Sequence, residues 1–402
     1  MNSKMLGSIA IVSGTAIGGG MLALPLATAG LGTLPALALL VVIWAISAYT
    51  ALLMLEINLK SGVGENVHAI TGKSLGKVGQ FLQGGSFLSL LYALTMVYLL
   101  GGSSLLNAKY ELLTGHSLDS KTAIGLFTLI FGGLIAVGVS WVDKVSRLLF
   151  PIMIVLLVVL VMFLLPEVSL STMVGDGIRA GIKEGGFYGA FMAAIPVVFT
   201  SFGFHVCIAT IVGYLDGEAK SLRKVLLIGS TLPLICYVFW LLVTLGTVGG
   251  DTISAFGGSL PELVKALQNV AQFSFIDQCI SFFADLALVT SFLGVTMSLF
   301  DFLAELTRAK SNLADRIQTW LLTFIPPLLC ALFYPDGFVK ILGYAAVPLV
   351  IMVIFLPIAM AIVQRRQGYE GYRVSGGNLA LGLLGVAGVG IILAQFIAAS
   401  SS

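Results

Sequence analysis

The chain has 402 residues, of which 58% are hydrophobic and only 10% are charged, and its mean hydropathy is +1.05. Soluble domains carry about 25% charged residues, so this composition excludes a soluble globular protein and predicts a polytopic membrane protein. The net charge of +2 gives no indication of a nucleic-acid surface. Cysteines 207, 236, 279 and 330 occur singly in apolar runs, so we expect neither a disulfide framework nor a metal site, and no cofactor.

Unbroken apolar runs of about 20 residues predict membrane-spanning helices rather than the strands of a barrel. We expect an all-α protein with eleven spans, at 6–29, 34–58, 79–106, 122–139, 147–165, 187–214, 225–248, 276–306, 319–333, 338–363 and 379–399. The connections between these spans place fifteen of the 21 Lys and Arg residues on one side of the bilayer and six on the other. The positive-inside rule then predicts a cytoplasmic N-terminus and an external C-terminus.

The first predicted span contains a poor helix-forming segment, SGTAIGGGMLALP, at residues 13–25. Glycine costs about 1 kcal/mol relative to alanine inside a helix, and proline removes a backbone donor. Gly14, Gly18, Gly19, Gly20 and Pro25 therefore predict that this helix unwinds partway. Unwound backbone in a membrane must be buried in protein or line a polar cavity, which makes it a candidate ligand site. A glycine packing face at Gly14 and Gly18 is the alternative.

The sixth predicted span has an interruption of its own, because Pro196 is followed by TSFGFH at residues 200–205. Interrupted helices at corresponding positions of two halves are typical of transporters built from inverted repeats. We therefore expect a first five-helix repeat at 1–166, an inverted second repeat at 167–364, and an additional helix with the C-terminus at 365–402. The two halves show no evident residue-by-residue identity.

The two interruptions predict a site for a zwitterion. The amides near the start of the outer half-helix of the first span suit a carboxylate, and the carbonyls around 200–203 suit an ammonium group. Rings and a thioether at plausible depth suit an aromatic side chain, although each of them has core packing as its alternative. The expected substrate-binding residues are Ala16, Ile17, Gly18, Gly19, Gly20, Tyr92, Met96, Thr200, Ser201, Phe202, Gly203, Phe204 and Tyr344.

Ionisable side chains inside predicted spans are costly and are functional candidates. His205 directly follows the second interruption and titrates near neutrality, so it is a candidate for proton coupling, with simple hydrogen bonding to a carbonyl as the alternative. Asp285 is the second candidate, as a buried, reversible proton site. For Glu56, Asp301 and Glu305, snorkelling or pairing with Arg308 is the competing explanation.

Adjacent hydroxyls in the eighth predicted span, Thr290 and Ser291, are possible ligands for a small cation such as Na⁺ together with carbonyls of the first span. The alternative is that they bond back to their own helix. A channel is disfavoured because no repeated filter sequence is present. A metal-dependent enzyme is disfavoured because His68, His116 and His205 lie in different topological compartments.

Several segments resemble bacterial permeases of the hydroxy/aromatic amino acid family. They are GTAIGGGMLALPLATAG at 14–30, FTSFGFH at 199–205, IVGYLDG at 211–217, FADLALVTSFLG at 283–294, and ALFYPDGFVKILGYA at 331–345. The resemblance covers nearly the full chain. It implies an inner-membrane symporter of the amino acid/polyamine/organocation superfamily, with the five-plus-five fold, that imports tyrosine with H⁺.

By the same resemblance, the substrate lies against 16–20 and 201–204, and Thr290 and Ser291 match the cation-site hydroxyls of sodium-coupled relatives. Span 147–165 has no lysine of the sort that some proton-coupled relatives place opposite that site, so the proton carrier is expected elsewhere. A tryptophan or broad aromatic permease and a Na⁺-coupled amino acid symporter are the alternatives. The lipid bilayer is an expected partner; nucleic acid is not.

Overall fold

The computed structural model describes residues 3–137, 139–173, 186–271, 273–309, 312–368 and 371–400, and these form helices and connections without a strand. The first half contains α1 (Ser3–Ala16), α2 (Gly19–Thr28), α3 (Thr33–Ser61), α4 (Val67–Thr114), α5 (Ser120–Val137) and α6 (Val139–Leu164). The second half contains α8 (Gly186–Ser201), α9 (Ile208–Tyr214), α10 (Ala219–Val248), α11 (Gly250–Ala255), α12 (Leu260–Val270), α13 (Ser274–Thr307), α14 (Leu313–Phe333), α15 (Phe338–Tyr344), α16 (Ala346–Val350), α17 (Leu356–Arg366) and α18 (Gly377–Ser400).

The described residues include nine helices long and apolar enough to cross a membrane, or ten if the bent pair of α1 and α2 is one span. This establishes a polytopic, all-helical membrane protein. Each predicted span has a helical counterpart; the predicted span 122–139 corresponds to the shorter α5 and includes residue 138, which lies outside the described residues. Eleven spans therefore remains a prediction.

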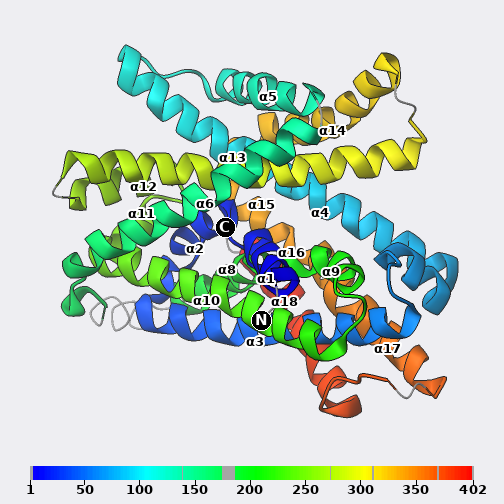
Figure 1. Ribbon diagram of the computed structural model, residues 1–402. Coiled ribbons are helices and arrows are strands. Elements are labelled where there is room, and N and C mark those ends of the chain that lie inside the picture. The colour runs from blue at the N-terminus through cyan, green and yellow to red at the C-terminus, as the bar shows by residue number, and fades with distance from the viewer. Residues whose placement is uncertain are drawn as a thin grey trace.

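α2 and the C-terminal half of α8 lie in the interior of the bundle, and other helices lie around them. In the most apolar 18-residue stretch of Gly186–Tyr214, 72% of the residues are buried within the protein. The corresponding share is 22% in Leu148–Glu167 and 33% in Gly377–Ser400. Figure 1 shows α3 and α10 running side by side, with α1 packed on α10. α2 packs between α8 and α13, so both interruptions are enclosed by other helices.

A kink at Gly76 separates the first turns of α4 from its long apolar part. The glycine has φ 67° and ψ −162°, a conformation that other residues adopt only with strain. The predicted span 79–106 begins just after this kink, so the sequence located the apolar segment although the helix extends further at both ends.

Candidate functional site

The first span is interrupted where its glycines predicted. α1 ends at Ala16, α2 begins at Gly19, and the two axes are bent by 49°. Gly18 has an extended backbone (φ 178°, ψ −149°), and no side chain caps the start of α2. The Gly18 amide donates no hydrogen bond to any of the described residues, which leaves one backbone donor available at the break.

The second interruption follows α8, which ends at Ser201. Phe202 and Gly203 are not helical, and the 3₁₀ turn Phe204–Cys207 leads into α9. The Phe204 amide donates to the Phe202 carbonyl at 2.9 Å, a tight local turn that replaces the helical bond. The predicted interruption at 200–205 is therefore confirmed.

The two interruptions contact each other directly. The Ser201 hydroxyl lies 3.3 Å from the Gly20 carbonyl oxygen while it also donates to Val197 O at 2.9 Å. The Tyr237 hydroxyl, from α10, lies 2.6 Å from the Ala16 carbonyl oxygen and 2.9 Å from the Ser201 carbonyl oxygen. One buried hydroxyl proton is thus shared between carbonyls freed by the two breaks. Tyr237 was not among the residues predicted from the sequence; the signal for it was a polar group in an apolar span that needs a partner when buried.

The glycines of the first break allow α13 and α4 to approach closely. The Gly19 amide donates to Ser291 Oγ on α13 at 2.7 Å. A Cβ atom on Gly18 would lie 2.1 Å from the same Ser291 oxygen, and a Cβ on Gly19 would lie 2.7 Å from Cε1 of Tyr98 on α4. Any side chain at these two positions would therefore force a neighbour to move.

The two hydroxyl residues predicted as cation ligands, Thr290 and Ser291, differ in their contacts. Ser291 faces the first break, but Thr290 donates to Leu286 O within its own helix at 2.7 Å. The Gly19 amide, expected to be open to a carboxylate, is held by Ser291 in this conformation. No cluster of three or more His, Cys, Asp or Glu side chains suited to a metal ion occurs among the described residues.

The predicted aromatic neighbours occupy different positions around the breaks. Phe202 is fully buried and makes an edge contact with the Tyr237 ring, at a centroid distance of 5.2 Å. Met96 is buried, whereas the Tyr92 hydroxyl donates to Leu322 O on α14 at 2.8 Å. Tyr344, on α15, is 41% exposed. The α4 ring observed against the first break belongs to Tyr98, which the sequence did not single out.

His205 connects the second interruption to α3. Phe204 and His205 stack at 4.6 Å, and the imidazole is 1% exposed. His205 Nε2 lies 2.7 Å from Thr50 Oγ1 and 3.1 Å from the Ser47 carbonyl oxygen. Thr50 Oγ1 itself donates to Ser47 O at 2.9 Å, so we assign the Nε2 proton as the donor in this network. Nδ1 is then unprotonated, buried, and without a partner among the described residues.

Two ion pairs link helices away from the breaks. Asp285 on α13 pairs with Lys109 on α4, with the side chains 25% and 41% exposed, so the aspartate is neither fully buried nor isolated. Glu56 on α3 receives two hydrogen bonds from Arg365 on α17, Nε to Oε1 at 2.7 Å and Nη2 to Oε2 at 2.8 Å. Its partner is therefore Arg365 and not Arg308, because the end of α17 packs against α3.

Comparison with known proteins identifies the family. The model of the tryptophan/tyrosine permease family matches residues 1–395. The chain is 37% identical to the tyrosine-specific transport system 1 of Haemophilus influenzae, over 96% of this chain and 95% of that protein. It is 32% identical to the glutamine transporter 2 of Aliivibrio fischeri (98% and 100% covered) and 32% identical to the tryptophan-specific transport protein of H. influenzae (98% and 95% covered). The chain thus belongs to the tryptophan/tyrosine permease family, and it is a transport protein rather than an enzyme.

Proposed function

We propose that this protein imports tyrosine across the bacterial inner membrane by proton symport. The observation that carries the proposal is the direct contact between two helix interruptions in the interior of the bundle. Backbone donors and acceptors released from helical hydrogen bonding meet there, and they are complementary to the carboxylate and ammonium groups of an amino acid. The similarity to the tyrosine-specific transport system 1 of H. influenzae supports an aromatic substrate.

The contacts at the interruptions correspond to a closed state in this proposal. Residues 16–20 and 197–202 are buried, and Ser291 and Tyr237 occupy backbone groups that a substrate would use. When substrate binds, it replaces these two hydroxyl contacts, and α1, α2, α8 and α9 move against the other helices. The substrate then binds the open and closed conformations with different affinities, which alternating access requires.

The finer architecture belongs to the same proposal. We infer eleven spans, an inverted pair of five-helix repeats at 1–166 and 167–364, and a final helix at 365–402. The enclosed positions of both interrupted helices support this arrangement. A cytoplasmic N-terminus and a periplasmic C-terminus follow from the distribution of basic residues.

His205 is the proposed proton carrier. Its Nδ1 atom is an unprotonated acceptor held in the interior by the Nε2 bonds to α3, at the end of the second interruption. Protonation there places a charge in a buried site, which favours a conformation that solvates it. Asp285 is the weaker candidate because Lys109 already balances its charge.

Substrate and ion are tested together in proteoliposomes that contain the purified protein. Labelled tyrosine should accumulate when an inward proton gradient is imposed, and it should continue to accumulate when choline replaces sodium. Unlabelled tyrosine should compete more strongly than tryptophan, phenylalanine or glutamine. A pocket that hydrogen-bonds the phenol rejects phenylalanine far more strongly than an apolar pocket does. Equal competition by the aromatic amino acids contradicts tyrosine specificity, and loss of uptake without sodium contradicts proton coupling.

A further inference from the structure

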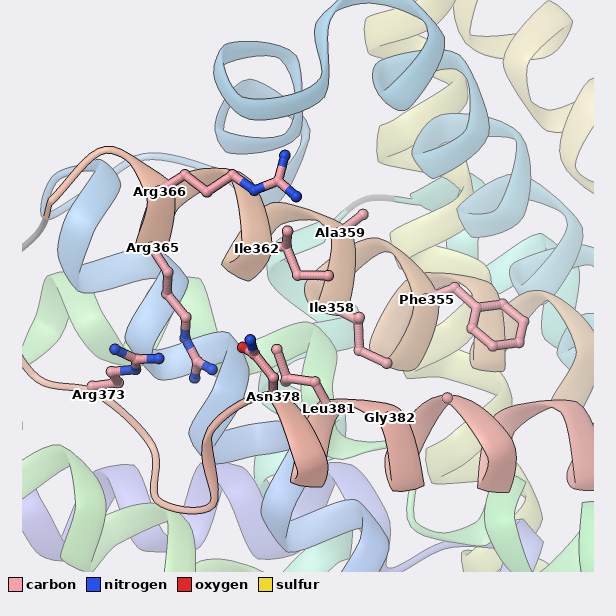
Figure 2. Close-up of a pocket in the computed structure, with 11 residues that line it drawn as sticks. Phe355, Ile358, Ala359, Ile362, Arg365, Arg366, Arg373, Asn378, Leu381 and Gly382 are labelled. Atoms are coloured by element: carbon pink, nitrogen blue, oxygen red, sulfur yellow. The ribbon is translucent and has the colours of Figure 1, made fainter.

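A groove separate from the helix interruptions lies between α17 and α18. Its volume is about 760 Å³, and apolar side chains line most of its length. Figure 2 shows α17 above and α18 below, with Ile358 and Leu381 between them and arginines gathered at one end. The groove is therefore apolar along the helices and cationic at their connected ends.

The cationic end is at a membrane surface whichever way the protein is oriented. α17 completes one candidate span and α18 begins the next, and only residues 367–376 connect them. A connection this short returns the chain to the bilayer from the side on which it left. The apolar part of the groove then lies within the depth of the acyl chains, and the arginines lie at the depth of the headgroups.

The arginines have more donors than their protein partners satisfy. Arg365 is paired with Glu56, yet its Nη1 atom is buried and has no partner among the described residues. Arg373 and Arg366 are exposed, and neither forms an ion pair within the described part of the chain. The Arg365 and Arg373 side chains point toward each other and toward Asn378 (Figure 2). Glu56 balances one of these two charges, so the Arg365 and Arg373 guanidinium groups keep one net positive charge that the anion of a ligand can balance.

The position of the cationic end is fixed by α3 and not by the groove itself. The Glu56 carboxylate accepts from the Val374 amide at 2.8 Å, and the Tyr49 hydroxyl donates to Ser375 O at 2.8 Å. These bonds hold the connection that carries Arg373 beside the end of α17. The Arg365 guanidinium and the backbone that carries Arg373 are consequently held in place before a ligand binds, which lowers the cost of ordering a ligand there.

The apolar part is open because glycines line it. A Cβ atom added to Gly382 would meet no atom within 4 Å, and one added to Gly385 would meet only Ile358 Cδ1, at 3.8 Å. Larger residues on this face of α18 would occupy the groove.

We propose that the groove between α17 and α18 binds one anionic phospholipid, with its phosphate at Arg365 and Arg373 and an acyl chain against Ile358, Leu381 and Gly382. A molecule with one negative end and one apolar end matches both parts of the groove. Basic pockets between membrane helices bind acidic headgroups by the same electrostatics.

Native mass spectrometry of the full-length protein in detergent tests this proposal. The protein is titrated with phosphatidylglycerol and, separately, with phosphatidylcholine of identical acyl chains; inorganic phosphate is added in a third arm. We expect at least about tenfold tighter retention of phosphatidylglycerol, since each basic residue at the surface contributes about fivefold. Inorganic phosphate should not displace the bound lipid. Equal retention of the two lipids, or displacement by phosphate alone, overturns the proposal.

Two variants distinguish the contribution of the headgroup to lipid binding from that of the acyl chain. Arg373→Gln should weaken phosphatidylglycerol retention about fivefold. Gly382→Leu should weaken retention of the lipid by filling the groove without a clash. Arg316→Gln removes the same charge from the exposed start of α14, and Gly390→Leu adds the same side chain to an open position on α18 outside the groove, so both controls should stay within twofold of wild type. Unchanged retention in either groove variant contradicts the site. The readout is lipid binding, so its outcome does not depend on tyrosine transport.

Discussion

The interruption between α1 and α2 differs from the interruption after α8 in what surrounds its backbone. At the first, glycines receive side chains from other helices: Ser291 and Tyr98 both approach within the space that a Cβ atom would need. At the second, the break itself supplies the side chains, since Ser201 reaches Gly20 and His205 reaches α3. The first break thus exposes backbone that side chains of other segments contact. The second break provides such a side chain, Ser201, and a titratable one, His205.

The largest effect is expected from filling the first break. Gly18→Leu should abolish tyrosine binding and uptake, because even its Cβ atom would lie 2.1 Å from Ser291 Oγ. Gly18→Ala should be partly rescued by Ser291→Ala, which removes the clashing oxygen; overpacking of this kind costs about 1–3 kcal/mol. The measurement is equilibrium binding of labelled tyrosine to purified protein, with Gly133→Leu, an open position, as the control. Full activity of Gly18→Leu would return these glycines to a packing role.

The role of His205 at the second break is tested by a substitution that keeps the hydrogen-bond donor at Nε2 and removes the titratable atom Nδ1. In His205→Gln, the amide nitrogen replaces Nε2 as the donor to Ser47 O, but no atom titrates in place of Nδ1. We expect uptake driven by a pH gradient to be lost while tyrosine binding stays within about threefold, a change of less than 1 kcal/mol. Normal gradient-driven accumulation by this variant would exclude His205 as the proton carrier.

A smaller effect should come from the hydroxyl shared by the two breaks. Tyr237→Phe keeps the ring contact with Phe202 but leaves the Ala16 and Ser201 carbonyls without this donor. A lost buried partner costs about 1–3 kcal/mol, so the closed state should lose this stability relative to open states. Cysteine-accessibility labelling on the two membrane sides should show increased opening in the variant. Unchanged accessibility would show that the hydroxyl does not stabilise closure.

The sequence was sufficient for the features that depend on local backbone chemistry. Apolar run length located helical segments, and glycine with proline located the interruption at 16–20 because both act within a few residues. The likeness of the quoted motifs identified the family. What the sequence did not provide was the choice among distant partners: Tyr237 lies 221 positions from Ala16, and Arg365 lies 309 positions from Glu56. Such pairings depend on helix packing, which no local spacing encodes.

The smallest change in tyrosine uptake is expected from breaking the Lys109 and Asp285 ion pair, which lies away from both helix interruptions. The two side chains are partly exposed, and pairs of this kind contribute about 0–1 kcal/mol. If the pair only connects α4 to α13, Asp285→Asn should reduce uptake modestly, and the neutral pair Lys109→Gln with Asp285→Asn should recover it. Uptake at a fixed proton gradient measures both. If instead the double variant remains uncoupled while His205→Gln is normal, the proton is carried at Asp285, and the second interruption serves only to bind the substrate.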